Sequence, residues 1–491
     1  AMAGEAASGA RSFIIDNIFV GLAQFLTKFR GLILIPLLVK GLGIESYGIY
    51  VQVLSFVGLA GGLLALNLHL PLVQFLAESR SSSGNLLATL QVSVLASVGA
   101  GALLLYLAAG PGARDALVGT DDTVVFGAAL LIAVAAGSRV FLMNAYRATD
   151  RIKLRTVIEF LGTLVELAGA VALVVSGYGM RAVLGFTAAW GLAFDVACFV
   201  HVARLLGLGR FDLAILVKAL RYSVPLVPAS VAAWALDRGD RFLLNVWRGE
   251  KEVGIYSAQY AWAALASAVL LPLQVTLVPK VAKLWATQPD EARRYLETSM
   301  RVFLMSAIGG CAILISCAPP ALQVLASAEV AVDSRTVVAL VSVGSLLWGA
   351  TILQSLVFYS THQTARVGMI NAAAAVINLV ANLVCIPRWG IRGAAVATAL
   401  GYSGAFILTL AMTRSYYGFL ASPRFVLGSI TAALAAGALA AGLVAQEYPL
   451  LAAPLAGAAY GLGLLLLGVV RRDEVVAAAS RLRRAGPRAE R

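Results

Sequence analysis

Residues 371–402 read NAAAAVINLVANLVCIPRWGIRGAAVATALGY, and this stretch decides the fold class. Its two apolar runs belong to the longer segments 367–386 and 391–413. Each segment is long enough to cross about 30 Å of hydrocarbon as a helix that rises about 1.5 Å per residue. Only the short sequence PRWG separates them. The stretch therefore predicts two membrane-spanning helices with a short connection.

The same pattern continues through the whole chain of 491 residues, of which 60% are hydrophobic and 13% charged. Soluble domains carry about 25% charged residues. We therefore expect an all-α, polytopic membrane protein with about fourteen spans: 13–39, 46–76, 86–110, 123–146, 156–176, 182–203, 222–247, 253–279, 300–318, 336–359, 367–386, 391–413, 425–445 and 449–470.

The distribution of basic residues predicts the orientation. If the N-terminus is cytoplasmic, the cytoplasmic segments hold 25 of the 38 Lys and Arg, the outer segments hold 8, and 5 lie within spans. This bias follows the positive-inside rule, so both termini are predicted to be cytoplasmic. It also accounts for the net charge of +13 without nucleic-acid binding.

The connections between spans are short, so no soluble domain is expected. The segment 46–76 is longer than one span requires, which predicts tilt or protrusion. Residues 289–298, PDEARRYLET, are predicted to form a short surface helix. Residues 1–10 are interpreted as a leader or cloning remnant, with no cleavable signal peptide. The four cysteines lie in apolar runs without metal-ligand spacing, so neither a disulfide nor a metal site is expected.

The chain repeats itself at nearly one offset. Three pairs of segments match: Tyr47–Tyr50 with Val253–Tyr256, Gly179–Ala182 with Gly390–Gly393, and Tyr146 with Tyr359. The repeat predicts two parallel six-span lobes, 11–210 and 211–415, related by an axis along the membrane normal and flanking a central cavity. Residues 416–470 would add two further helices, and 471–491 would form a basic cytoplasmic tail.

Three stretches resemble the polysaccharide transporter branch of the multidrug/oligosaccharidyl-lipid/polysaccharide exporter superfamily, the Wzx-type flippases. They are TKFRGLILIPLLVKGLGIESYGIY (27–50), DRFLLNVWRGEKEVGIYSAQY (240–260) and the stretch 371–402. The resemblance covers about 11–415. It departs from the family pattern at Ile44, and at Lys28 and Lys40, where the family usually has Arg.

The resemblance implies a flippase that moves a polyprenyl-diphosphate-linked oligosaccharide across the bacterial inner membrane by alternating access. The product would serve assembly of O-antigen, capsule or exopolysaccharide, with a polysaccharide polymerase and a chain-length regulator as candidate partners. Within the superfamily, a peptidoglycan-precursor flippase or a multidrug/ion antiporter is the alternative. A membrane glycan polymerase or ligase, or a passive scaffold, is an alternative from another class. No enzymatic motif such as a Walker A loop or HExxH is present.

Ionisable groups inside a membrane cost about 2.5–3.5 kcal/mol each on insertion scales, so each requires a reason. The basic ones are Lys28, Arg30, Arg139, Arg238 and Arg241, which are candidate contacts for the diphosphate. The acidic ones are Asp16, Glu159, Glu166, Asp195, Asp237 and Asp240, which are interpreted as counter-ions or as sites of Na⁺ or H⁺ coupling. No other cofactor is expected.

Spacing refines these expectations. Asn17, Gln24 and Lys28 share one helical face, which predicts a polar stripe. Asp237 and Arg241 are four residues apart and are predicted to pair within their helix. That cluster serves either substrate binding or packing. Arg139 either faces the substrate or snorkels.

Three amide side chains, Asn371, Asn378 and Asn382, share one face of the span 367–386. Such amides commonly join membrane helices by hydrogen bonds, so a packing role is favoured over substrate contact.

Overall fold

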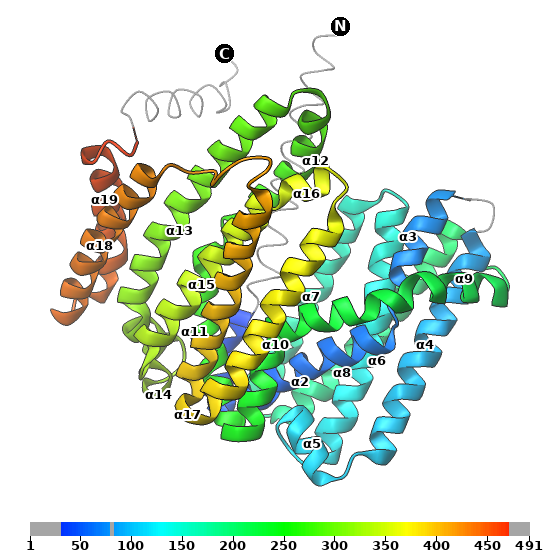
Figure 1. Cartoon of the computed structure of the whole chain (residues 1–491). Helices are drawn as coiled ribbons and strands as arrows, with labels where there is room; N and C mark the ends of the chain where they lie inside the picture. The colour runs from blue at the N-terminus through cyan, green and yellow to red at the C-terminus, as the bar shows by residue number, and fades with distance from the viewer. Residues whose placement is uncertain (1–30, 79–82, 471–491) are drawn as a thin grey trace, which may run out of the picture.

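The computed structural model describes residues 31–78 and 83–470. Every regular element in these residues is a helix (Figure 1). The predictions for Asp16, Asn17, Gln24, Lys28 and Arg30 lie outside the described residues, as does the predicted tail 471–491.

The first half of the described chain begins with a helix over Gly31–Leu42. Its further helices are α2 (Ile44–Leu64), α3 (His69–Glu78), α4 (Ser83–Ala108), α5 (Pro111–Val118), α6 (Thr123–Ala148), α7 (Ile152–Val175), α8 (Met180–Leu206) and α9 (Leu213–Ser223).

The second half contains η2 (Val224–Leu226), α10 (Val227–Arg248), α11 (Glu250–Ala263), η3 (Ala264–Ser267), α12 (Leu270–Thr287), α13 (Pro289–Leu325), α14 (Ala328–Ala331), α15 (Ser334–Gln354), α16 (Leu356–Ser360), α17 (Thr364–Thr413), α18 (Pro423–Ala445) and α19 (Pro449–Leu466).

Twelve segments of the described residues are long and apolar enough to cross a membrane. Two further apolar segments fall short of that criterion. One is Gly31–Leu42, and the other is the interrupted segment formed by α11, η3 and α12. Together they agree with an estimate of about fourteen spans.

The segment 46–76, predicted as one long span, is two helices. Leu66 and Asn67 have φ of 52° and 54°, and this left-handed backbone ends α2 before α3 begins at His69. Such conformations are uncommon for residues other than glycine, and Asn tolerates them better than most. The apolar run is longer than one span because it contains two helices with a break between them, and not because one long helix is tilted.

Residues 289–298 do not form a separate surface helix. They are the first turns of α13, a helix of 37 residues that, together with α12, extends furthest at one end of the described molecule (Figure 1). At about 1.5 Å per residue it is longer than a bilayer core requires. Its polar first turns therefore project from the membrane while its apolar remainder crosses it.

The stretch that decided the fold class, 371–402, lies within α17. Gly390 interrupts this helix with φ 53° and ψ −129°, so two antiparallel halves meet at PRWG. Their packing is close, because a Cβ on Gly401 would lie 2.9 Å from Asn378 Cβ. The prediction of two spans with a short connection is confirmed.

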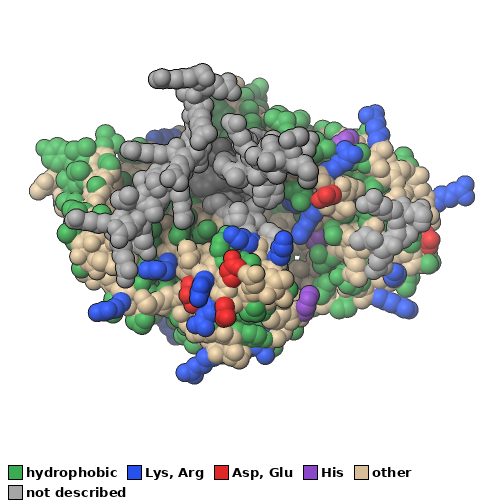
Figure 2. Space-filling view, turned by 90° about the horizontal axis from the view of Figure 1, so that it is seen from above, with side chains coloured by type: hydrophobic (Ala, Val, Ile, Leu, Met, Phe, Trp, Pro, Cys, Tyr) green, Lys and Arg blue, Asp and Glu red, His purple; other side chains and the backbone are tan. Residues whose placement is uncertain are grey.

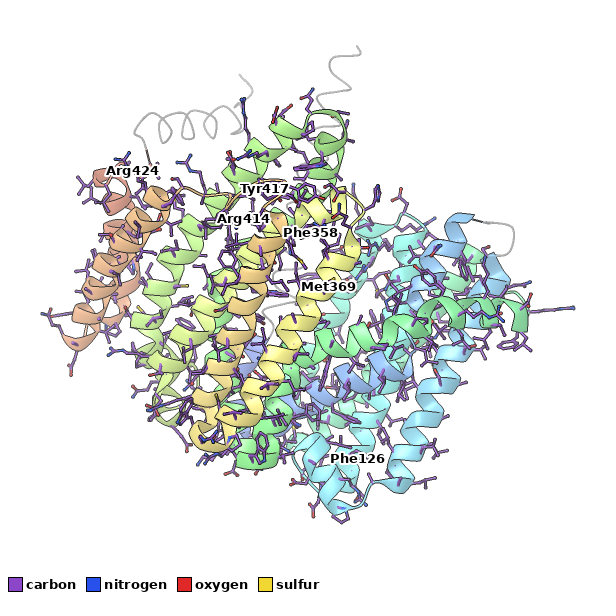
Figure 3. All side chains as sticks on the ribbon, in the orientation of Figure 1. Phe126, Phe358, Met369, Arg414, Tyr417 and Arg424 are labelled. Atoms are coloured by element: carbon purple, nitrogen blue, oxygen red, sulfur yellow. The ribbon has the colours of Figure 1, made fainter. Side chains whose placement is uncertain are left out.

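Two ends of the molecule can be distinguished. Arg414, Tyr417 and Arg424 lie toward one end, with the start of α13, whereas Phe126 lies toward the other (Figure 3). Figure 2 views the first of these ends and shows Lys and Arg side chains around its edge. This end corresponds to the predicted cytoplasmic side, and α5, α14 and the break in α17 mark the predicted outer side (Figure 1).

Helices α2 and α11 cross on the predicted outer side at the repeated glycines. A Cβ on Gly48 would lie 1.9 Å from Glu250 O, and a Cβ on Gly254 would lie 2.5 Å from Ile44 O. Each glycine therefore faces the backbone of the other helix. Only residues without a side chain permit this approach, which explains why the Gly appears in both copies of the repeat.

Candidate functional site

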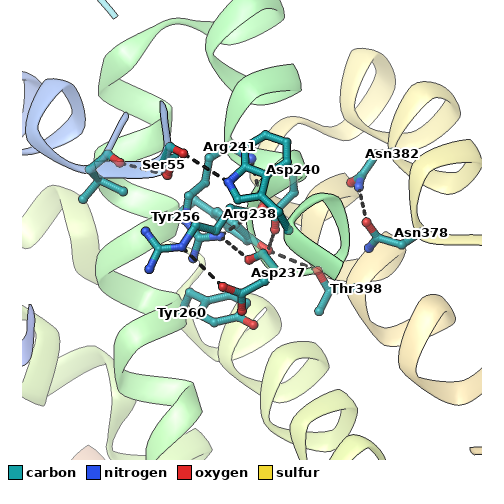
Figure 4. Close-up of polar contacts among 12 residues, drawn as sticks. Ser55, Asp237, Arg238, Asp240, Arg241, Tyr256, Tyr260, Asn378, Asn382 and Thr398 are labelled. Carbon is teal, nitrogen blue, oxygen red and sulfur yellow. Dashed lines mark hydrogen bonds and ion pairs between the residues drawn. The ribbon is translucent and has the colours of Figure 1, made fainter. Parts of the chain in front are cut away.

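A buried polar network links α10 to α11 and α17. Arg241 Nη1 donates to Asp240 Oδ1 at 3.0 Å, and Tyr256 Oη donates to Asp240 Oδ2 at 2.7 Å (Figure 4). The Arg241 guanidinium also lies 4.8 Å from the centre of the Tyr260 ring. The side chains of Arg241 and Asp240 are only 10% and 4% exposed. This pair is satisfied by its own neighbours, as expected of a packing element.

The predicted pairing of Asp237 with Arg241 is wrong. Arg241 Nη1 reaches only the backbone oxygen of Asp237, at 3.0 Å. The Asp237 carboxylate instead accepts from Arg238 Nε at 3.3 Å, and these side chains are 66% and 40% exposed. The adjacent residue Asp240 competes successfully for Arg241, because Tyr256 holds the Asp240 carboxylate inside the protein.

Asp237 also lines a pocket of about 220 Å³ between α10, η3, α15 and α17. Tyr260 and Tyr402 form part of its wall, with their hydroxyl oxygens 3.3 Å apart. Trp348 lies beside them and stacks on the Tyr402 ring at 5.1 Å between centroids. The pocket therefore combines a carboxylate, phenol hydroxyls and aromatic faces next to the half-exposed Arg238.

The charges predicted in α6 and α8 pair with each other. Arg139 Nε donates to Asp195 Oδ1 at 3.1 Å, and the guanidinium lies 5.1 Å from the centre of the Phe194 ring. Arg139 remains 32% exposed whereas Asp195 is 6% exposed. This arrangement fits a counter-ion pair between two helices better than a snorkelling arginine.

The two glutamates of α7 have different surroundings. Glu159 accepts from Arg155 Nη2 at 3.2 Å, a pair four residues apart on one helix with both side chains about one-third exposed. Glu166 is buried at 8% exposure. Glu159 and Glu166 are seven residues apart, which places them on one face of α7, yet their environments differ.

The amides of α17 pack within that helix. Asn382 Nδ2 donates to Asn378 Oδ1 at 2.9 Å, and both side chains are buried (Figure 4). Asn371 is half-buried and lies apart from this bond. This bond joins residues four apart on one helix and not two helices, so the favoured role of joining helices stays a prediction.

Sequence reasoning missed the aromatic part of the site. Tyr256, Tyr260 and Tyr402 surround Asp240 and Arg241, and Trp234 Nε1 joins α10 to α2 by donating to Ser55 O at 3.1 Å. A signal was present, because Tyr256 belongs to the repeated motif that also contains Gly254. A tyrosine hydroxyl can donate a hydrogen bond to a carboxylate buried in the membrane, as Tyr256 does to Asp240.

The second repeated motif builds equivalent ion pairs at the predicted outer side. Arg181 Nε lies 2.6 Å from Asp122 Oδ2, and Arg392 Nη2 lies 2.5 Å from Asp333 Oδ1. In both pairs, the two residues are 59 positions apart in the sequence. The offset of 211 that links the two motifs therefore also links their partners.

Glutamine side chains give a further correspondence. Gln52 Nε2 donates to Leu117 O in α5 at 3.3 Å, and Gln259 Nε2 donates to Val330 O in α14 at 2.8 Å. In each half, a glutamine that follows the repeated glycine thus holds a short helix at the outer surface.

Together, the helical fold and the polar groups buried among its spans define a multi-pass membrane protein. Comparison with known families is more specific. The chain belongs to the family described as polysaccharide biosynthesis protein, whose model matches residues 15–285. A second model, described as lipid II flippase MurJ, matches residues 251–453. None of the curated proteins searched matches significantly.

Solved structures show the same fold. The lipid II flippase MurJ in an inward closed conformation has a TM-score of 0.72 at 12% identity, with 91% of this chain and 98% of that chain covered. An inward-facing multidrug MATE family transporter of the MOP superfamily has a TM-score of 0.57 at 15% identity, with 82% and 97% covered. A point mutant of the Vibrio cholerae MATE transporter VcmN has a TM-score of 0.55 at 15% identity, with 82% and 95% covered. These relatives are transporters and flippases, not enzymes.

Proposed function

We propose that this protein moves a polyprenyl-diphosphate-linked oligosaccharide from the cytoplasmic to the outer leaflet of the bacterial inner membrane. The observation that carries the proposal is the match of residues 15–285 to the polysaccharide biosynthesis family. The physical task fits a two-lobed helical protein, since a diphosphate and a glycan require a polar path while the polyprenyl chain remains in lipid. Rocking of the two lobes would expose that path to each side in turn.

Among the three described cations proposed for the path, Arg238 has the most exposed side chain, at 40% against 32% for Arg139 and 10% for Arg241. Its partner Asp237 lines the 220 Å³ pocket and is itself 66% exposed. Exposed ion pairs of this kind contribute little energy, so a phosphate can replace the carboxylate at low cost. Arg241 is already held by Asp240 and supports the site instead. Lys28 stays a proposed contact from the sequence.

A peptidoglycan precursor is the second candidate cargo. The MurJ model matches residues 251–453, and the MurJ structure has a TM-score of 0.72. Because this cargo also carries a polyprenyl diphosphate, positive charge does not distinguish it from an oligosaccharide-linked lipid. The difference lies in the headgroup, which must be tested directly.

The test is translocation in proteoliposomes with two fluorescent cargoes, a polyprenyl-diphosphate oligosaccharide and a lipid II analogue, with and without an imposed Na⁺ or H⁺ gradient. We expect protein-dependent movement of the oligosaccharide cargo, and a loss of about tenfold in Arg238→Gln, which removes one charge-assisted contact. Arg335→Gln, an exposed change outside the pocket, serves as the matched control.

The two cargoes give distinct results. Movement of the lipid II analogue alone would favour the second candidate. Movement of neither cargo by folded protein under either gradient would contradict the flippase proposal. Movement of the oligosaccharide cargo that Arg238→Gln leaves unchanged would keep the function and remove Arg238 from the path.

A further inference from the structure

A second pocket opens on the predicted outer side, where four segments meet. It has a volume of about 430 Å³ and is lined by the end of α10, the start of α11, the turn before α15 and the break in α17. It shares none of its lining residues with the 220 Å³ pocket described above. It is therefore a separate feature of the surface rather than part of the proposed path.

Arginine is concentrated in this pocket. Only 8 Lys and Arg fall in the predicted outer segments, and three of them, Arg248, Arg388 and Arg392, line it. Two carboxylates, Glu252 and Asp333, line it as well. The formal charge of these five side chains is thus +1, which complements a singly charged anion.

Two of the arginines keep their charge unneutralised among the described residues. Arg392 is paired with Asp333 at 2.5 Å. In contrast, Arg248 Nη2 donates to Pro387 O at 2.8 Å, and Arg388 Nη1 donates to Val384 O at 2.9 Å. A carbonyl orients a guanidinium but does not cancel its charge. Each group has five N–H donors, so further donors remain for a ligand.

The repeat shows that this charge is an addition to one half of the molecule. Arg392 with Asp333 corresponds to Arg181 with Asp122. At the same offset of 211, however, the first half has Gly177-Tyr178 where the second half has Arg388-Trp389. The first half forms its turn with the shared kind of pair and without this cation. The extra cation therefore has a role that the first half lacks.

The position of the pocket indicates what it binds. Trp389 lines it and is 54% exposed, at the point where α17 turns back into the membrane. Exposed tryptophan and arginine side chains near helix ends are typical of the headgroup level of a bilayer. Arginine recognises phosphate with paired N–H donors. We propose that Arg248 and Arg388 bind the phosphate group of a phosphodiester, the headgroup of an outer-leaflet phospholipid, in this pocket. This proposal does not depend on which cargo the protein moves.

The experiment measures ligand retention by the purified full-length chain in detergent with native mass spectrometry. The probes are short-chain phosphatidylglycerol, inorganic phosphate and a short-chain diacylglycerol that lacks phosphate. The test protein is Arg248→Gln/Arg388→Gln. The matched control is Arg114→Gln/Arg335→Gln, which also removes two outer cations but none from the pocket.

We expect the test protein to bind phosphatidylglycerol about tenfold more weakly than the wild type, and the control to bind like the wild type. If inorganic phosphate shows the same arginine dependence, the phosphate group alone is sufficient and a soluble phosphate can fill the site. If only the lipid shows it, the lipid headgroup is the ligand. Equal binding by all three proteins, or equal binding of diacylglycerol and phosphatidylglycerol, would overturn the proposal. Monodisperse elution of each variant verifies folding.

Discussion

Asp240 and Arg241 are adjacent residues on α10, and their charges neutralise each other inside the protein. Tyr256 and Tyr260 complete their surroundings, so the pair has hydrogen-bond partners without any ligand. An ion pair of this kind is costly to break, because removal of one member leaves the other charged and buried. Its role at the scale of residues is therefore to fix α10 against α11.

The first prediction concerns the stability of this pair. Asp240→Asn should lower the free energy of unfolding by about 3–5 kcal/mol, because Arg241 remains buried without its counter-ion. Asp237→Asn, at a side chain that is 66% exposed, should cost about 0–1 kcal/mol. Thermal unfolding in detergent measures both. The double variant Asp240→Asn/Arg241→Met should recover part of the loss, and equal effects of the two single changes would contradict this role.

The second prediction concerns pH. Burial acts to raise the pKa of Asp122, but hydrogen bonds from Arg181 and from the N–H groups of Val124 and Val125 outweigh it, and the pKa lies below its usual value. A carboxylate with a depressed pKa stabilises the folded state above its unfolded pKa of about 3.9. That contribution is lost as the pH falls through the folded pKa.

Stability should therefore decline in the acid range below about pH 4, and Asp122→Asn should be less stable at neutral pH with a shallower acid decline. Melting temperatures between pH 3 and 7 measure both effects. Asp121→Asn, the exposed neighbour, is the matched control. An unchanged acid decline in Asp122→Asn would show that other carboxylates dominate it.

At the scale of helices, the crossing of α2 and α11 holds the two halves together on the predicted outer side. Gly48 and Gly254 each face the other helix's backbone there. Asn245 Nδ2 adds a link just below by donating to Asp115 O at 2.8 Å, which joins α10 to α5. The crossing is therefore a close backbone contact reinforced by a buried amide.

The third prediction tests this crossing. Gly254→Ala should force α2 and α11 apart, because the added Cβ would lie 2.5 Å from Ile44 O. Labelling of a cysteine at position 245 by a membrane-impermeant thiol reagent should then increase several-fold over the same cysteine with Gly254 intact. Gly62→Ala, on α2 with no atom within 4 Å of its Cβ position, should leave labelling unchanged. The four native cysteines are buried and give a low background. Unchanged labelling in Gly254→Ala would mean that the crossing does not close this side.

The elements differ in how well the sequence predicts them. Apolar run length is sufficient for α6, α8 and α15, because a continuous run of that length in lipid has no alternative to a helix. Run length fails to predict helix ends where a helix breaks within an apolar run and the residues at the break remain mostly hydrophobic. Leu66-Asn67 and the η3 segment Ala264–Ser267 interrupt their runs through backbone geometry alone. Composition carries no information about such breaks.

The same limit applies to the candidate site. The sequence identified Arg139, Asp195, Asp240 and Arg241 as intramembrane charges, because each is conspicuous against an apolar background. It did not identify their partners. Helical spacing favoured Asp237 for Arg241, whereas the decisive contact came from Tyr256 on another helix. Pairing between helices depends on packing, which a single sequence does not specify.

At the scale of the whole molecule, the repeat organises the contacts on the predicted outer side. The crossing glycines, the glutamines that hold α5 and α14, and the pairs Arg181–Asp122 and Arg392–Asp333 all occur twice. Their positions in the chain fit the two parallel lobes that the sequence predicts. If the lobes proposed at 11–210 and 211–415 rock about this region, the contacts within each lobe persist while those across the axis separate.

The last prediction follows from that distinction. Cysteines introduced at Asp115 and Asn245, which are hydrogen-bonded across the two lobes, should abolish translocation once joined by a short, cleavable thiol cross-linker. Reduction should restore it, because the lobes can then separate. Cysteines at Asp122 and Arg181, an ion pair within the first lobe, should tolerate the same cross-linker with little loss. Cargo movement in proteoliposomes is the measurement. Movement that persists in fully cross-linked 115/245 protein would mean that the cargo crosses without opening this contact, and a rocking mechanism about α2 and α11 would have to be abandoned.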